Sequence, residues 1–154
     1  MSCMQTEWST YSLVDTNILV YALDDSDEFK HEVANDLFES LIAGDEKLAV
    51  STQILSETLN VFAMAKMAQS SFNFEDVYSI ISDIVHLSKI PKLLVTSETV
   101  LGAAKLHTQF NVRFYDALIA ATMKENGITT IYTEDKDFEK ISGIIVINPF
   151  AKTI

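Results

Sequence analysis

Acidic side chains occur at four places that could meet at one end of a folded sheet. Three are the single residues Asp15, Glu57 and Asp116, and the fourth is the segment 133–138, which holds several acids. Carboxylates held close together cannot all remain ionised unless a counter-charge lies among them. A site made of oxygen ligands alone suits Mg²⁺ or Mn²⁺. If the fold brings these acids together, their chemistry is that of a hard divalent cation.

Asp15 and Asp116 also have ordinary structural explanations. Asp15 follows a short apolar run and could simply cap the helix that begins near Asn17. Asp116 lies in the first turn of a predicted helix, where the helix dipole favours a negative charge. A ligand site remains open for both, because ligands of open α/β sheets gather outside the carboxyl ends of the strands.

Glu57 lies within an apolar stripe of its predicted helix. The other residues of the stripe are Ile54, Val61, Met64 and Ala68. A carboxylate among core-facing positions is costly to desolvate unless it is paired, hydrogen-bonded or bound to a cation. Glu57 therefore either reaches solvent at the edge of the stripe or has such a partner.

The segment 133–138 crowds three acids directly after a predicted strand. Within it, Glu134 is typical of an ordinary solvated charge. The hydroxyl of Thr133 could cap the short helix that follows, or orient a water or a phosphate.

The composition excludes several other functions. Four widely spaced glycines rule out both Gly-rich phosphate-binding fingerprints. A single cysteine, Cys3, can form neither an internal disulfide nor a multi-thiolate metal site. With no leader and no long apolar run, the chain is expected to be cytoplasmic and without a membrane span. A net charge of −11 with one arginine, Arg113, lacks the basic footprint of passive nucleic-acid binding.

The 154 residues predict a single domain, 1–154. Short β-branched runs alternate with longer helical segments, which indicates an α/β fold. Its central, mainly parallel sheet of about four or five strands should be covered by helices on both faces. Strands are expected at 11–15, 48–51, 93–95, 130–132 and 144–147. Helices are expected at 17–23, 29–43, 52–67, 74–89, 98–110 and 114–126. The strand order is not readable from the sequence.

Four segments of the chain resemble, in order, the acidic motifs of PIN-domain ribonucleases. They are Leu13-Val14-Asp15-Thr16-Asn17-Ile18-Leu19, the Ser56-Glu57 pair, Tyr115-Asp116-Ala117-Leu118-Ile119-Ala120-Ala121 and Thr133-Glu134-Asp135-Lys136-Asp137-Phe138. Their principal acids are 42, 59 and 19 residues apart, and together the motifs span nearly the whole chain. In length, the chain looks most like the VapC-type toxins of toxin–antitoxin systems.

The resemblance implies a PIN-like three-layer α/β/α fold and a metal-dependent endoribonuclease that hydrolyses RNA phosphodiester bonds. The residues implied as catalytic metal ligands for one or two Mg²⁺ or Mn²⁺ ions are Asp15, Glu57, Asp116 and Asp135. The residues implied as their support are Asn17, Thr133 and Asp137. Asp135 is preferred over Asp137 as the fourth ligand because it stands two residues after the threonine of the motif.

The same resemblance implies the toxin of a type II toxin–antitoxin pair. Its partners would be an RNA substrate, an antitoxin with a basic segment and a second copy of the chain. Arg113 could bind substrate or be the structural partner of an acid.

Two other functions remain open. A non-catalytic PIN-fold scaffold that binds protein or RNA would be expected to have lost at least one ligand. An aspartate-based phosphatase with Asp15 as nucleophile usually needs another acid two residues on, where Asn17 stands.

Overall fold

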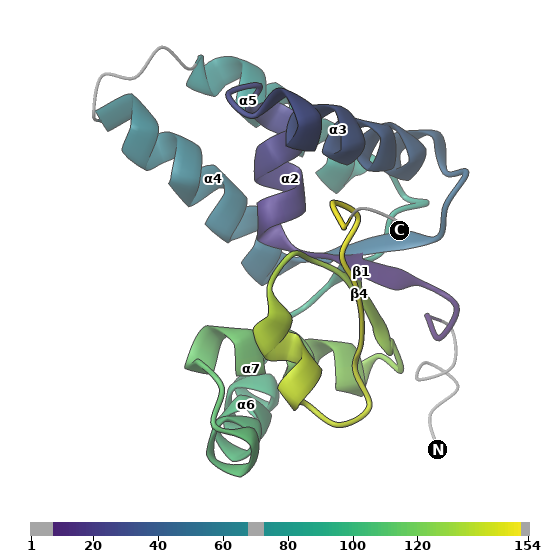
Figure 1. Ribbon diagram of the computed structural model, residues 1–154, viewed down its shortest axis with the longest axis vertical. Coiled ribbons are helices and arrows are strands. Elements are labelled where there is room, and N and C mark those ends of the chain that lie inside the picture. Colours follow the sequence, from purple (N-terminus) through teal and green to yellow (C-terminus); the bar gives the residue numbers. More distant parts are fainter. Residues whose placement is uncertain (1–7, 68–72, 152–154) are drawn as a thin grey trace.

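The central layer is a five-stranded sheet in which every pairing is parallel. The computed structural model describes residues 8–67 and 73–151. The strands are β1 (Ser12–Val14), β2 (Leu48–Ser51), β3 (Lys92–Leu93), β4 (Thr130–Tyr132) and β5 (Ile145–Ile147). Their order is β3-β2-β1-β4-β5, which places β1 in the middle (Figure 1). The predicted α/β class and parallel sheet are confirmed.

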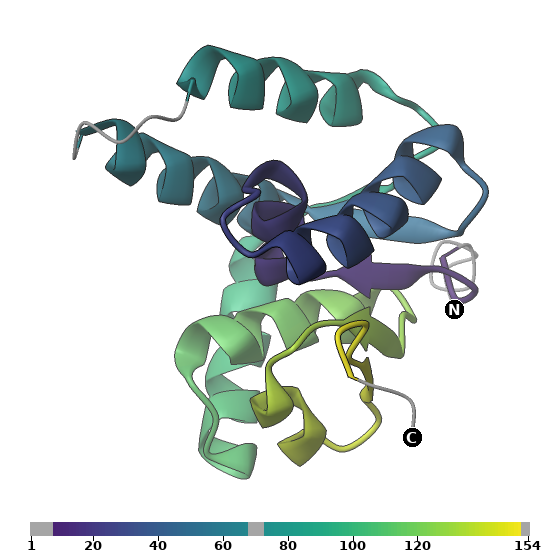
Figure 2. The same ribbon diagram turned by 45° about the horizontal axis from the view of Figure 1, so that its top comes forward.

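Helices cover both faces of the sheet. They are α2 (Thr16–Leu23), α3 (Glu28–Ala43), α4 (Thr52–Met67), α5 (Phe74–His86), α6 (Ser97–Phe110), α7 (Phe114–Glu125) and the 3-10 helix η1 (Lys136–Lys140). Helices α2 to α5 lie on one side, and α6, α7 and η1 lie on the other (Figure 1 and Figure 2). Right-handed crossovers explain this division, because the chain moves outward from β1 to β3 and then crosses back to β4. The three-layer α/β/α arrangement is confirmed.

The core lies along the central strands and α7. Leu13, Val50 and Ile131 are inaccessible to solvent, as expected for strands that are covered on both faces. Helix α7 is buried without interruption from Ala117 to Met123 and packs against α6. Its buried middle fixes the position of its first turn, which carries Asp116. Among the described residues, no helix combines the length and the apolar character needed to cross a bilayer.

The register of β1 against β4 brings two distant segments together. Val14 lies opposite Tyr132, so the residues that follow each strand leave the sheet side by side. The amide of Asp15 donates to the carbonyl of Tyr132 at 3.0 Å. The connections after β1 and after β4 lead to opposite edges of the sheet. A topological switch point of this kind is where open α/β sheets form a ligand crevice.

Two predicted boundaries are wrong by a few residues. Helix α5 ends at His86 instead of residue 89, because Leu87 already has extended backbone and its carbonyl accepts from the Ile90 amide in the turn that follows. Strand β3 covers Lys92–Leu93 instead of 93–95. Its partner β2 ends at Ser51, which pairs with Leu93, and leaves no strand for the next two residues to pair with.

The apolar stripe predicted around Glu57 is buried at one end only. Ile54 is inaccessible to solvent, whereas Val61 is 42% exposed and Met64 is 62% exposed. Ala68 lies outside the described residues. Helix α4 extends beyond the sheet, and this explains the exposure of its later turns (Figure 1). Glu57 therefore stands at the boundary between the buried and the exposed part of the helix.

Candidate active site

Asp15 is a buried carboxylate at the carboxyl end of β1. It caps α2 by accepting a hydrogen bond from the Thr16 amide at 2.8 Å, and only 6% of the residue is exposed. Burial, together with the charges of Glu57 and Asp116, raises the pKa of Asp15 to about 6, although hydrogen bonds from Thr133 and Thr16 oppose this. The capping role is confirmed. The raised pKa further marks a carboxylate whose charge is poorly compensated.

The hydroxyl of Thr133 connects β1, α2 and the segment that follows β4. It donates to Asp15 Oδ2 at 2.8 Å and accepts from Asn17 Nδ2 and from the amide of Asp135, both at 3.0 Å. Thr133 is fully buried, so these bonds form away from water. The cap of η1 is Asp135, which makes the capping role considered for Thr133 wrong. Its hydroxyl instead orients Asp15.

Glu57 is held by two side chains that were not singled out from the sequence. The hydroxyl of Thr16 donates to Glu57 Oε2 at 2.7 Å, and Gln53 Nε2 donates to Oε1 at 2.7 Å. Gln53 also donates to the carbonyl of Tyr115 at 3.0 Å, which ties α4 to the first turn of α7. The available signal was the spacing of Gln53, one helical turn before Glu57.

Asp116, Asp135 and Asp137 form a second acidic group. One oxygen of each lies within 4.8 Å of the others. Arg113 donates from Nε to Asp116 Oδ2 at 2.9 Å and from Nη2 to Asp135 Oδ2 at 2.7 Å. Burial raises the pKa of Asp116; Arg113 lowers it, and the charges of Asp135 and Asp137 raise it. A cation supplied by the chain itself therefore lies among these acids.

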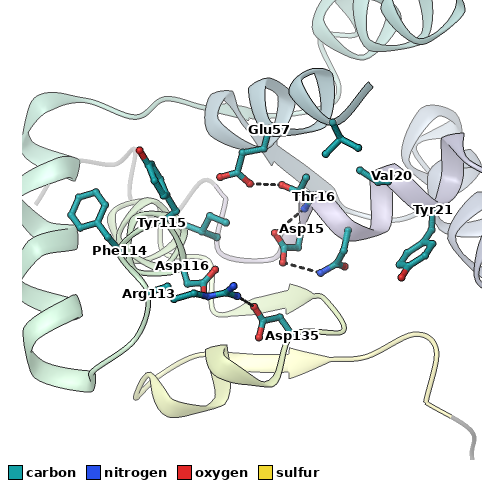
Figure 3. A pocket seen from close by; sticks show the side chains of 13 residues that line it. Asp15, Thr16, Val20, Tyr21, Glu57, Arg113, Phe114, Tyr115, Asp116 and Asp135 are labelled. Carbon is teal, nitrogen blue, oxygen red and sulfur yellow. Dashed lines mark hydrogen bonds and ion pairs between the residues drawn. The ribbon is translucent and has the colours of Figure 1, made fainter. Parts of the chain in front are cut away.

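One cleft of about 560 Å³ is lined by all four predicted ligands. Figure 3 shows Glu57 and Asp15 facing Asp116 and Asp135 across it, with Arg113 between the last two. Asn17 also lines the cleft. Asp137 is not among the lining residues, and its carboxylate lies 3.3 Å from Lys140.

Glu134 turns away from this cleft. Its carboxylate accepts hydrogen bonds from Lys30 Nζ at 2.7 Å and from the Tyr21 hydroxyl at 3.0 Å. The ammonium of Lys30 also lies 5.5 Å from the centre of the Phe150 ring. Glu134 is therefore not the solvated charge that its sequence suggested. It anchors the segment after β4 to α2 and α3, and so helps to present Asp135.

The residues of the cleft fit a hard divalent cation. Carboxylate oxygens are the ligands that Mg²⁺ and Mn²⁺ prefer. The guanidinium of Arg113 already places a positive charge between Asp116 and Asp135. In addition, Asn17 Oδ1 is buried and has no hydrogen-bond partner among the described residues. A buried acceptor of this kind needs a donor, a water or a cation.

Comparison with known proteins gives a family and a fold. The PIN domain family model matches residues 12–144. No curated protein sequence matches the chain. A solved structure from Pyrobaculum aerophilum is 19% identical with a TM-score of 0.63, over 94% of this chain and 88% of that one.

Two further solved structures share the fold. VapBC2 from Rickettsia felis, bound to a fragment of its promoter DNA, is 22% identical with a TM-score of 0.62, over 90% of this chain and 98% of that one. VapC20 from Mycobacterium tuberculosis, a toxin that cleaves the sarcin-ricin loop, is 20% identical with a TM-score of 0.63, over 82% of this chain and 92% of that one. At these identities, the likeness concerns the fold.

Proposed function

Because the chain belongs to the PIN domain family, we propose that it is a metal-dependent endoribonuclease and the toxin of a type II toxin–antitoxin pair. The observation that carries the proposal is the convergence of Asp15, Glu57, Asp116 and Asp135 on one cleft. RNA as the substrate is supported by the shared fold with a toxin that cleaves the sarcin-ricin loop. The family match covers most of a single proposed domain, 1–154.

The proposed ligands are Asp15, Glu57, Asp116 and Asp135, and they would hold one or two Mg²⁺ or Mn²⁺ ions. A bound ion of this kind supplies a water of lowered pKa and a positive charge for the phosphoryl and leaving oxygens. Thr133 and Asn17 fix the first of these carboxylates, and Thr16 and Gln53 fix the second. Ligands oriented in advance in this way need little rearrangement during the reaction.

The fourth ligand is proposed to be Asp135 and not Asp137. Asp135 lines the cleft and its carboxylate faces Asp116 across Arg113. The carboxylate of Asp137 forms an ion pair with Lys140, and its backbone amide donates a hydrogen bond to Asp135 Oδ1 at 2.9 Å. These contacts suit a residue that supports Asp135.

The proposed partners follow from charge and from exposed apolar surface. An acidic cleft in a chain of net charge −11 favours an antitoxin whose inserted segment is basic. A toxin–antitoxin complex from Klebsiella pneumoniae shares the fold.

The exposed Val61 and Met64 of α4 support association with a second copy of the chain, which sedimentation velocity tests directly. We propose that the protein acts in the cytoplasm, on RNA present there.

The proposal is tested by cleavage of a mixed RNA pool with Mg²⁺ or Mn²⁺ and with EDTA. The variants are Asp15→Asn and Asp116→Asn. Asp83→Asn is the matched control, because it makes the same chemical change at an exposed position of α5. We expect metal-dependent cutting by the wild type and by Asp83→Asn, and a loss of at least about 100-fold in the two cleft variants.

Other outcomes would contradict the proposal in different ways. Cutting that persists in both cleft variants would mean that the site is wrong. A folded protein that binds metal and a partner but cuts no RNA would favour the non-catalytic scaffold. A phosphoryl group trapped on Asp15 would establish a phosphatase instead.

A further inference from the structure

Arg113 clamps two of the proposed metal ligands. Its guanidinium uses two different nitrogens, Nε on Asp116 at 2.9 Å and Nη2 on Asp135 at 2.7 Å. A planar guanidinium that bonds two carboxylates at once is held more specifically than a single surface ion pair. The described chain therefore carries its own cation at the place where a divalent ion is proposed to bind.

The needs of helix α7 do not explain why an arginine stands at position 113. The residue is the N-cap of α7, and its side chain makes no capping hydrogen bond. Short polar side chains are the usual caps, and a positive charge is disfavoured at the positive end of the helix dipole. Asp116, Asp135 and Asp137 offset this disadvantage, since all three lie within 4.0 Å of the guanidinium nitrogens. The arginine is therefore placed where it pairs with the three acids and not where it would stabilise the helix.

The Arg113 guanidinium and a divalent ion would compete for the same two carboxylates. Both hydrogen bonds of Arg113 use Oδ2 atoms, one from Asp116 and one from Asp135. A divalent ion bound to these two carboxylates neutralises their charge and repels the positive guanidinium, so the two cations compete for the pair. The Arg113 side chain is 70% exposed, so it can swing outward without disturbing the core.

Resting on the function proposed above, we infer that Arg113 closes the metal site when no divalent ion is bound, is displaced by the ion, and then binds a phosphate of the RNA. Displacement leaves the guanidinium at the mouth of the cleft, next to the 67% exposed Tyr115. Arg113 is the only arginine of a chain with net charge −11. A guanidinium is the side chain best suited to bidentate binding of phosphate.

The displacement is tested by Mn²⁺ affinity, measured by calorimetry on the full-length protein. The variants are Arg113→Gln, Arg113→Lys and the matched control Lys140→Gln. The control removes the same charge beside the same acidic group, where Lys140 lies 3.3 Å from Asp137, but it frees neither Asp116 nor Asp135.

We expect Arg113→Gln to bind Mn²⁺ about tenfold more tightly than the wild type, because two charge-assisted hydrogen bonds no longer compete with the ion. Lys140→Gln should stay within about threefold of the wild type, as expected for an exposed ion pair. Arg113→Lys should lie between them, because one ammonium cannot span both carboxylates as the guanidinium does.

Several results would overturn the displacement. Equal gains in Arg113→Gln and Lys140→Gln would show a general charge effect, and unchanged or weaker binding in Arg113→Gln would show no competition. If Asp116→Asn loses Mn²⁺ binding while Arg113→Gln binds like the wild type, the proposed metal site stands and this inference falls. If no variant binds Mn²⁺, both fall.

The phosphate-binding step is tested separately, with RNA cleavage at saturating Mn²⁺. We expect Arg113→Gln to raise KM for RNA about fivefold, with kcat within about twofold of the wild type. The KM of Arg113→Lys should lie between those of the wild type and Arg113→Gln. A fall in kcat at unchanged KM would overturn phosphate binding by Arg113.

Discussion

At the scale of single residues, Thr133 is the point at which three parts of the cleft meet. Its hydroxyl serves Asp15, Asn17 and the amide of Asp135 at once. We expect Thr133→Val to lower the free energy of unfolding by about 2–3 kcal/mol, because the change keeps the shape but leaves the Asp135 amide without its partner and takes one hydrogen bond each from Asp15 and Asn17. Urea unfolding in the presence of EDTA measures the loss.

Thr122→Val is the control for this prediction. Thr122 is also fully buried, but its hydroxyl donates only to the Leu118 carbonyl of its own helix, at 3.0 Å. That carbonyl belongs to a helix in which backbone groups are already paired, so the expected loss is below about 1 kcal/mol. Equal losses in Thr122→Val and Thr133→Val would contradict the connecting role of Thr133.

The buried carboxyl of Asp15 makes the stability of the metal-free protein depend on pH. Its pKa is about 6 in the folded chain and 3.8 for an ordinary aspartate, so the folded state binds more protons between these values. The free energy of unfolding therefore falls as pH rises through this window, by at most about 3 kcal/mol from this one group. Asp15→Asn removes this dependence.

The measurement is the difference in unfolding free energy between Asp15→Asn and the wild type, in EDTA. We expect the difference to move in favour of the variant from about pH 4 to about pH 7 and to level off above that. If the difference in unfolding free energy does not change with pH, burial does not destabilise the ionised form of Asp15.

Individual residues differ in how far the sequence reveals them. The acids of the cleft could be predicted because they interrupt apolar patterns and stand in recognisable motifs. Thr16 and Gln53 could not, because a polar side chain that holds a ligand looks the same in the sequence as one that faces water. The alternative that Arg113 pairs with acids is confirmed, and substrate binding by it stays a proposal.

At the scale of elements, the sequence is most informative where a segment determines its own structure. Strand β2, helix α4 and strand β4 have the predicted bounds, 48–51, 52–67 and 130–132. The predicted bounds of strand β3 are wrong because the extent of this strand is set by the end of β2, which lies far away in the sequence. The order β3-β2-β1-β4-β5 depends on such long-range pairings throughout, so periodicity along the chain could not show it.

At the scale of the whole molecule, the dominant property is the net charge of −11. Like charges repel in the compact state, and salt screens that repulsion. We expect the melting temperature of the metal-free protein to rise by a few degrees from about 0.01 M to about 0.1 M KCl, over which the screening length falls from about 30 Å to about 10 Å. Thermal unfolding in EDTA measures this.

An equal osmolality of sucrose is the control for the salt series, since a neutral solute does not screen charge. If KCl and sucrose raise the melting temperature equally, charge repulsion is not the cause. A melting temperature that falls with KCl would mean that the ion pairs, such as those of Arg113 and Lys30, outweigh the repulsion.

The pairing of β1 with β4 also determines when a newly made chain can complete its cleft. During translation, Asp15 and Glu57 leave the ribosome well before Thr133 and Asp135. Until β4 has emerged and docked against β1, the two halves of the cleft cannot face each other. A growing chain would therefore gain the proposed nuclease site only once β4 has docked, and a product that stops anywhere before β4 would lack it.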